Sequence, residues 1–289
     1  MSASRTIIAI TAVVIALLGC GSGSNQVPAA DALSLGLPGT SSPANWTLGG
    51  VPCALIPPAD AAAPLGTGTC PGVRPGAIVR SDVGQCTLNF LFQGSDGSRY
   101  IGTAGHCILG TSPFGGDVGE MAWASGTGPV ARDADGNPIG EFAYAILQDP
   151  KDFSLIRLDP LVEASAAMCH FGGPTTVNDD RPDITQPVVL NWFGNGILVG
   201  TLLPARSALA AGMPDPDHVF ADGAAAPGDS GSGIISSDGR AVGVVVTVGV
   251  HIGTSFDSGV IGITRLTPQV ERAQQVLGVD LVLQTAPTL

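Results

Sequence analysis

Glycine and proline recur so often along this chain that long helices are excluded over most of its length. The 289 residues include 41 glycines and 23 prolines, the two poorest helix formers. Apolar residues instead form short runs, as where Leu88, Phe90 and Phe92 alternate with other side chains. The turn Gly94–Ser98 follows, and the chain returns from Arg99. Alternation of this kind is typical of strands with one buried face, so the sequence predicts an all-β fold.

Further apolar runs, each bounded by turn residues, predict the remaining strands. They are Ile139–Leu147, Phe153–Leu158, Val188–Phe193, Ile197–Leu203, Gly233–Ser236, Ala241–Val248 and Val260–Ile263. The segment Asp133–Asn137 resembles a calcium loop, but Tyr144 stands at the twelfth position where a carboxylate is needed, so a hairpin turn is expected. One C-terminal helix is predicted, capped by Thr267 and ended by Gly278.

The N-terminus reads as a targeting segment. Residues 1–19 contain Arg5 followed by the uncharged run Ile7–Leu18, which is shorter than the roughly 20 residues of a membrane span and indicates a signal peptide. Leu17 to Cys20 resemble a bacterial lipobox, which implies lipidation of Cys20 and anchoring at the outer face of a bacterial membrane. An ordinary secretory signal with a chance cysteine is the alternative.

The segments that follow are poor in large apolar residues. Residues 20–50 are rich in small and polar residues and predict a flexible tether. Residues 51–77, rich in proline and alanine, predict an irregular lead-in to the folded domain.

The charge balance restricts the partners. A formal net charge of −12 argues against a nucleic acid, because that partner needs a basic surface. The membrane is expected to be reached only through the lipid at Cys20, and the protein is expected to be a monomer. No cofactor is expected. A metal site is not expected either, because the cysteines lack Cys-x-x-Cys spacing and Cys169–His170 stands isolated.

Export allows disulfides. Of six cysteines, lipidation of Cys20 would leave an odd number. Cys86 and Cys107 flank the hairpin predicted above and form the best pair. Cys53 with Cys70 is the second choice, which would leave Cys169 free.

Three short segments together contain what nucleophilic acyl transfer requires. They read Thr-Ala-Gly-His-Cys at 103–107, Asp-Phe-Ser-Leu-Ile at 152–156 and Gly-Asp-Ser-Gly-Ser-Gly at 228–233. A serine hydroxyl needs an adjacent base to become a nucleophile, and histidine suits that role. A carboxylate holds the imidazole in one tautomer, and glycines beside the serine leave backbone N–H groups open to an oxyanion.

The order of these segments resembles the chymotrypsin-like serine peptidases, especially the compact bacterial ones. The resemblance covers residues 78–283, leaving 284–289 as a tail, and implies two six-stranded antiparallel β-barrels with the active site between them. It implies that Ser230 is the nucleophile, His106 the base and Asp152 its orienting carboxylate. The N–H groups of Gly228 and Ser230 would form the oxyanion hole, and Cys86–Cys107 matches the bridge that holds the histidine loop.

The identity of the third catalytic residue is open, and two positions depart from the family pattern. Asp149 and Asp159 compete with Asp152 for the third role. Ser232 stands where the family has a second glycine, and Val246 where a serine supports the catalytic aspartate.

The partner of Asp229 is also open. The family's animal members pair this acid with a new amino terminus, but the faint match at Ile78 lies too close to Cys86. An internal arginine is the alternative, with Arg80 and Arg157 among the possibilities.

The family's specificity position falls on Ala224. With Ala225, Val246 and Val248 it predicts an apolar pocket for a small or medium side chain, not for Arg or Lys. The other histidines, His170, His218 and His251, have no accompanying catalytic or metal-binding motif and are expected to be structural or solvated.

The sequence suggests three possible functions. The first is a serine endopeptidase acting on proteins or peptides. The second is a protease-like binding scaffold that has lost turnover. A serine esterase is the third, but its Gly-x-Ser-x-Gly motif fails at Ser232.

Overall fold

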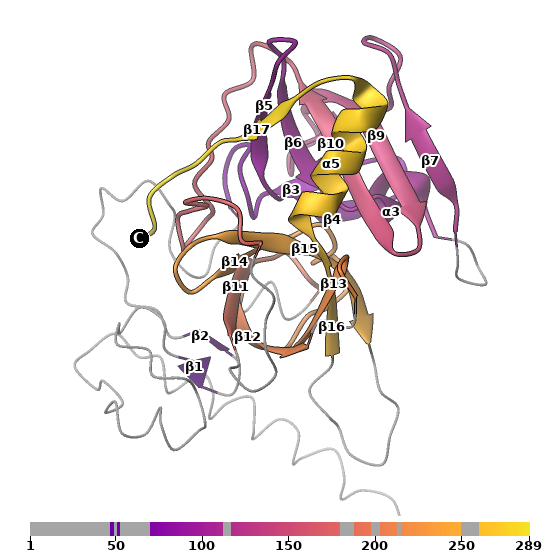
Figure 1. Cartoon of the computed structure of the whole chain (residues 1–289). Coiled ribbons are helices and arrows are strands. Elements are labelled where there is room, and N and C mark those ends of the chain that lie inside the picture. Colours follow the sequence, from indigo (N-terminus) through magenta and orange to yellow (C-terminus); the bar gives the residue numbers. More distant parts are fainter. Residues whose placement is uncertain are drawn as a thin grey trace, which may run out of the picture.

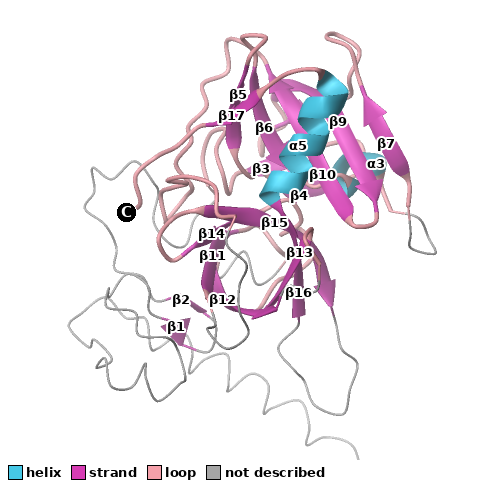
Figure 2. Ribbon diagram, in the orientation of Figure 1, coloured by secondary structure: helices cyan, strands magenta, loops and turns pink. Residues whose placement is uncertain are grey.

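The structure is a computed structural model that describes residues 47–48, 51–52, 70–111, 117–179, 188–197, 203–212, 215–249 and 260–289. The predicted signal peptide, Cys20, Cys53, His251 and the side chain of Val248 lie outside this part. The described chain forms two β-rich lobes (Figure 1) and two helices, α3 (His106–Leu109) and α5 (Leu266–Leu277) (Figure 2). Neither helix is long and apolar enough to cross a membrane.

The second lobe is a closed antiparallel barrel. Its strands follow the order β11 (Val189–Phe193), β12 (Ala205–Gly212), β13 (His218–Asp222), β16 (Val260–Arg265), β15 (Ala241–Gly249) and β14 (Gly233–Ser236). Pairing of β14 with β11 closes the ring, so no strand edge is left unpaired. Leu190, Val219, Ile234, Val245 and Ile263 pack in its core.

The first lobe is a nine-stranded antiparallel sheet. Its order is β17 (Leu281–Leu283), β5 (Leu91–Gly94), β6 (Arg99–Thr103), β10 (Lys151–Leu158), β9 (Pro138–Gln148), β8 (Val130–Arg132), β3 (Ile78–Arg80) and β4 (Gln85–Thr87), with β7 (Gly119–Ala122) on β9. The chain between β4 and β5 joins the ends of this sheet: Leu88 donates to Ala77, and Asn89 donates to Gly102 in β6. The sheet therefore curls back on itself.

The predicted fold class, an all-β chain with a C-terminal helix, is confirmed. The expectation of two six-stranded barrels holds for the second lobe, whereas the first lobe is a nine-stranded sheet.

The strand predicted at Ile197–Leu203 lies mostly outside the described residues, which omit 198–202. Ile197 itself lies in a turn, and the next described strand, β12, begins at Ala205. The predicted cap of α5 was wrong. The cap of α5 is Arg265, and Thr267 instead bonds the Asp179 carboxylate.

The C-terminal segment returns to the first lobe. Helix α5 lies against β9 and β10 (Figure 1), and its Arg272 pairs with Glu120 of the neighbouring strand β7 at 2.5 Å. Strand β17 then pairs with β5. Residues 284–289 continue as bonded chain rather than a free tail, since Ala286 donates to Pro174 and Leu289 to Phe171.

The structure confirms the disulfide Cys86–Cys107 and corrects the other pairing. Cys70 is bonded to Cys169, so Cys70 is not available to Cys53 and Cys169 is not free. The reason is tertiary: the Cys169 N–H donates to the Pro75 carbonyl, and this bond places the lead-in against the segment that connects the lobes.

His170 follows this disulfide in an unusual position. Its backbone has φ = 71°, and its side chain is buried against the edge of the Phe171 ring. Neither ring nitrogen has a hydrogen-bond partner among the described residues. Burial lowers the pKa of His170 to about 4, because the charged imidazolium loses its hydration there.

This burial predicts acid sensitivity. Since the unfolded chain protonates His170 near pH 6.5 and the folded chain only near pH 4, the free energy of unfolding should fall as the pH drops through that window. We predict that His170→Asn, a residue that tolerates positive φ, removes about 3 kcal/mol of this loss. Urea unfolding at steps between pH 7 and pH 4 measures the free energy of unfolding of both proteins. If this free energy falls by the same amount in the wild type and in His170→Asn, the prediction is refuted.

Candidate active site

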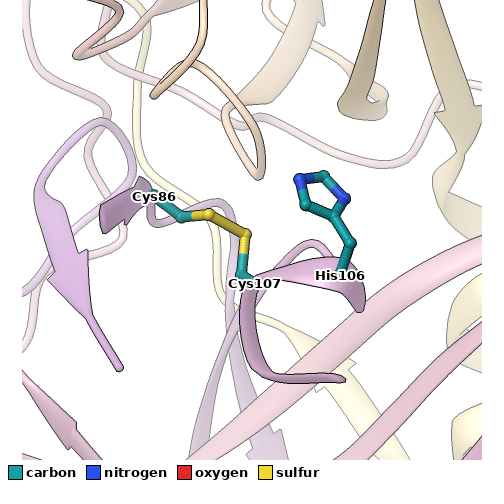
Figure 3. Close-up of side chains that lie close together, drawn as sticks. All are labelled: Cys86, His106 and Cys107. Atoms are coloured by element: carbon teal, nitrogen blue, oxygen red, sulfur yellow. A yellow bond between two sulfur atoms is a disulfide. The ribbon is translucent and has the colours of Figure 1, made fainter. Parts of the chain in front are cut away.

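His106 is placed by the tight packing of the residue before it. It is the first residue of α3, directly after β6, and Gly105 precedes it. A Cβ on Gly105 would lie 1.9 Å from the Ile146 carbonyl oxygen in β9, so only glycine fits there. Cys107 follows His106, and Figure 3 shows the His106 ring beside the Cys86–Cys107 disulfide.

The structure brings His106 and Asp152 together. His106 Nδ1 lies 2.7 Å from Asp152 Oδ2, and the His106 backbone N–H donates to Oδ1 at 2.9 Å. Both side chains are largely buried, with exposed fractions of 17% and 11%. Because an ionised carboxylate only accepts, Nδ1 carries the proton and Nε2 of the neutral ring is left as an acceptor.

The competing carboxylates lie elsewhere. Asp149 is exposed, and its N–H bonds to Asp117. Asp159 is exposed and accepts from the Leu161 N–H. Of the three candidates for the orienting carboxylate, Asp152 alone is bonded to His106.

The side chains of Cys86, His106 and Cys107 are close enough to suggest a metal site, with their ligand atoms within 4.8 Å of one another. Both sulfurs are joined in the disulfide. Since metal ligation needs the thiolate, this cluster cannot hold an ion through its cysteines while the bond is intact.

Ser230 lies in the turn between β13 and β14, at the junction of the two lobes. Its carbonyl accepts from the Thr87 N–H at 2.9 Å. The next residue, Gly231, packs against Thr103 and Ala104, just before His106. No hydrogen bond joins the Ser230 hydroxyl to the His106 ring among the described contacts, and such bonds are often long before a substrate binds.

Three backbone N–H groups of this turn are bonded, and two are open. Asp229 donates to Ala226, Gly231 to Val245 and Ser232 to Asp229. The N–H groups of Gly228 and Ser230 donate to no group in the part of the chain that the structure describes. Two open donors flanking one residue can stabilise an anionic oxygen.

Asp229 forms a buried ion pair with Arg206 of β12. Arg206 Nη1 lies 2.6 Å from Asp229 Oδ2, Nη2 bonds Oδ1, and both side chains are fully buried. The N–H groups of Gly196 and Ala226 add one bond at 2.8 Å to each oxygen. The Arg206 guanidinium also lies over the Trp192 ring, 5.2 Å from its centre.

The two arginines considered from the sequence do not make this contact. Arg157 pairs with Glu141, and Arg80 lies in β3, beside Arg132 of β8. The sequence did not single out Arg206, because it lies among the small residues of β12, which lack the apolar pattern that predicts a strand.

The predicted pocket residues have different surroundings. Ala224 is exposed, and its carbonyl accepts from Arg206. Ala225 packs against the barrel core, whereas Val246 is buried with the core of the first lobe. The Ser232 hydroxyl is buried and has no partner among the described residues.

One ion pair joins Lys151, the residue before Asp152, to the second lobe. Lys151 Nζ lies 2.6 Å from Asp217 Oδ1, just before β13.

No family model and no curated protein matches the chain. Among solved structures, a glutamic acid specific serine protease is similar over 73% of this chain and 100% of its own, with a TM-score of 0.48 and 16% identity. Thermobifida fusca protease A is similar over 73% of this chain and 99% of its own, with a TM-score of 0.48 and 13% identity. A Nocardiopsis protease is similar over 73% of this chain and 98% of its own, with a TM-score of 0.47 and 17% identity.

The buried pair generates a stability prediction. Arg206→Met leaves the Asp229 carboxylate buried without its cation, which should lower the free energy of unfolding by about 3–5 kcal/mol. The double variant with Asp229→Asn should recover part of it. The matched control is Arg240→Met, whose pair with Asp238 lies nearer the surface, with an expected loss of about 1 kcal/mol or less. Equal losses for Arg206→Met and Arg240→Met in urea unfolding would contradict the prediction.

Proposed function

We propose that the protein is a serine endopeptidase that hydrolyses peptide bonds through an acyl-enzyme. One arrangement carries the proposal: the His106–Asp152 pair lies beside a turn in which the N–H groups of Gly228 and Ser230 are open. A His–Asp pair alone is common in proteins, but two open amides beside a serine hydroxyl, one of them the serine's own, suit an oxyanion.

In this mechanism each group has one task. The Ser230 hydroxyl attacks the peptide carbonyl while His106 Nε2 accepts its proton. Asp152 holds the ring through Nδ1 and stabilises the imidazolium that forms. The Gly228 and Ser230 N–H groups bind the oxyanion. His106 then gives the proton to the leaving amine, and water, deprotonated by His106, hydrolyses the acyl-enzyme.

A binding scaffold without turnover is the second candidate. The observation that favours it is Val246, a buried apolar side chain at the position where the resembled family has a serine that supports the catalytic aspartate.

A fluorophosphonate probe separates the two, because it labels only an activated serine. We predict labelling of the wild type at Ser230 and at least a 1000-fold loss of peptide hydrolysis in Ser230→Ala and His106→Ala, in line with the losses of a triad. Asp152→Asn should lose about as much, since the amide keeps the shape but lacks the charge and turns an N–H donor towards Nδ1, which favours the wrong tautomer of the ring.

The exposed Ser237 supplies the control, because Ser237→Ala alters a serine outside the turn. It should keep full labelling. A wild type that stays unlabelled and inactive on a mixed peptide library would establish the scaffold instead. In the same library we expect cleavage after small or medium apolar residues, as proposed for the pocket at Ala224, and a strong preference for Arg or Lys would exclude that pocket.

We also propose that Cys20 anchors the protein by a lipid at the outer face of a bacterial membrane, on the strength of the lipobox-like sequence before it. Expressed in a bacterium, the wild type should sediment with membranes and Cys20→Ser should not. The physical reason is burial of the acyl chains of the thioether-linked lipid, because stable anchoring needs more than one buried chain. Wild-type protein recovered in the soluble fraction at the same yield as Cys20→Ser would reject the anchor.

A further inference from the structure

The Gly228 N–H belongs to a peptide unit that is held from its other side. The Pro227 carbonyl of that unit accepts from the Ile197 N–H at 2.8 Å. In a trans peptide the N–H and the C=O point in opposite directions. The Gly228 N–H is therefore directed away from Ile197.

The next peptide unit is held by a side chain of the first lobe. The Thr87 hydroxyl donates to the Gly228 carbonyl at 2.8 Å. Thr87 is fully buried, and its N–H also donates to the Ser230 carbonyl. One residue thus contacts the carbonyls of both residues whose N–H groups are open.

Asn195 determines the direction in which the Thr87 proton points. Its Nδ2 lies 2.9 Å from the Gly76 carbonyl, which can only accept, so this atom is the amide nitrogen. The same Nδ2 and the Asn195 N–H approach the Thr87 hydroxyl at 3.0 and 3.3 Å. Because both groups only donate, the single hydroxyl proton of Thr87 goes to Gly228.

Gly228 needs such a restraint. Its φ is +104°, and a residue without a Cβ can rotate there at little steric cost. A rotation would turn its N–H away from the neighbouring Ser230 N–H. An oxyanion donor works only if it is oriented before the charge develops.

We propose that Thr87, held by Asn195, is a positioning residue that orients the oxyanion-binding N–H of Gly228 through the Gly228 carbonyl; this rests on the peptidase function proposed above. The residue touches no reacting atom. Its effect should therefore be on the transition state rather than on substrate binding.

The test compares Thr87→Val with the wild type on one peptide substrate. Thr87→Val should lower kcat by about 10- to 100-fold, a fraction of the loss for deleting a donor, with KM within about twofold. The affinity for a peptide aldehyde of the same sequence, whose adduct carries the oxyanion, should fall in parallel with kcat/KM. Thr87→Ser, which keeps the hydroxyl, should restore most of kcat.

Ser207→Ala is the control. Ser207 is also buried, and its hydroxyl bonds Asn191 within the second barrel instead of the turn. It should keep kcat. If Thr87→Val does not fold, Asn195→Ala takes its place, with an expected loss of about 3- to 10-fold in kcat.

The outcomes are separable. A wild type without Ser230 labelling defeats the peptidase function itself. An active wild type with a folded Thr87→Val whose kcat stays within twofold, or whose aldehyde affinity does not change, overturns the positioning role alone.

Discussion

The turn at Ser230 depends on one buried charge. A carboxylate can remain out of water only when its oxygens are paired, and Asp229 meets this requirement through Arg206 and two backbone N–H groups. Holding Asp229 inward leaves its neighbours on either side with their N–H groups open. The arrangement that could bind an oxyanion is thus a consequence of how an acid is buried next to it.

The sequence predicted what local patterns encode. Alternating apolar runs identified most strands of both lobes, and three residue motifs selected His106 and Asp152, which the structure joins by a hydrogen bond. It could not predict Arg206 or the Cys70–Cys169 bridge. Both contacts join segments far apart in the chain, and partner choice there is decided by how the lobes pack rather than by neighbouring residues.

Two departures from the pattern of the family that the sequence resembles have structural counterparts. Val246 replaces a polar side chain with one that packs into the core of the first lobe, at 8% exposure. Ser232 replaces a glycine and buries a hydroxyl that has no partner among the described residues; nothing in the structure explains this second change. An unpaired buried hydroxyl costs about 1–3 kcal/mol.

The return of the chain to the first lobe has a consequence for folding. Strand β17 and helix α5 complete a lobe whose other strands come much earlier in the sequence, and they cover β5, β9 and β10. Until β17 docks, the outer edge of β5 is an unpaired strand edge, which is open to pairing with another chain. Contacts between segments this far apart in the sequence give the lobe a high contact order, which slows its folding.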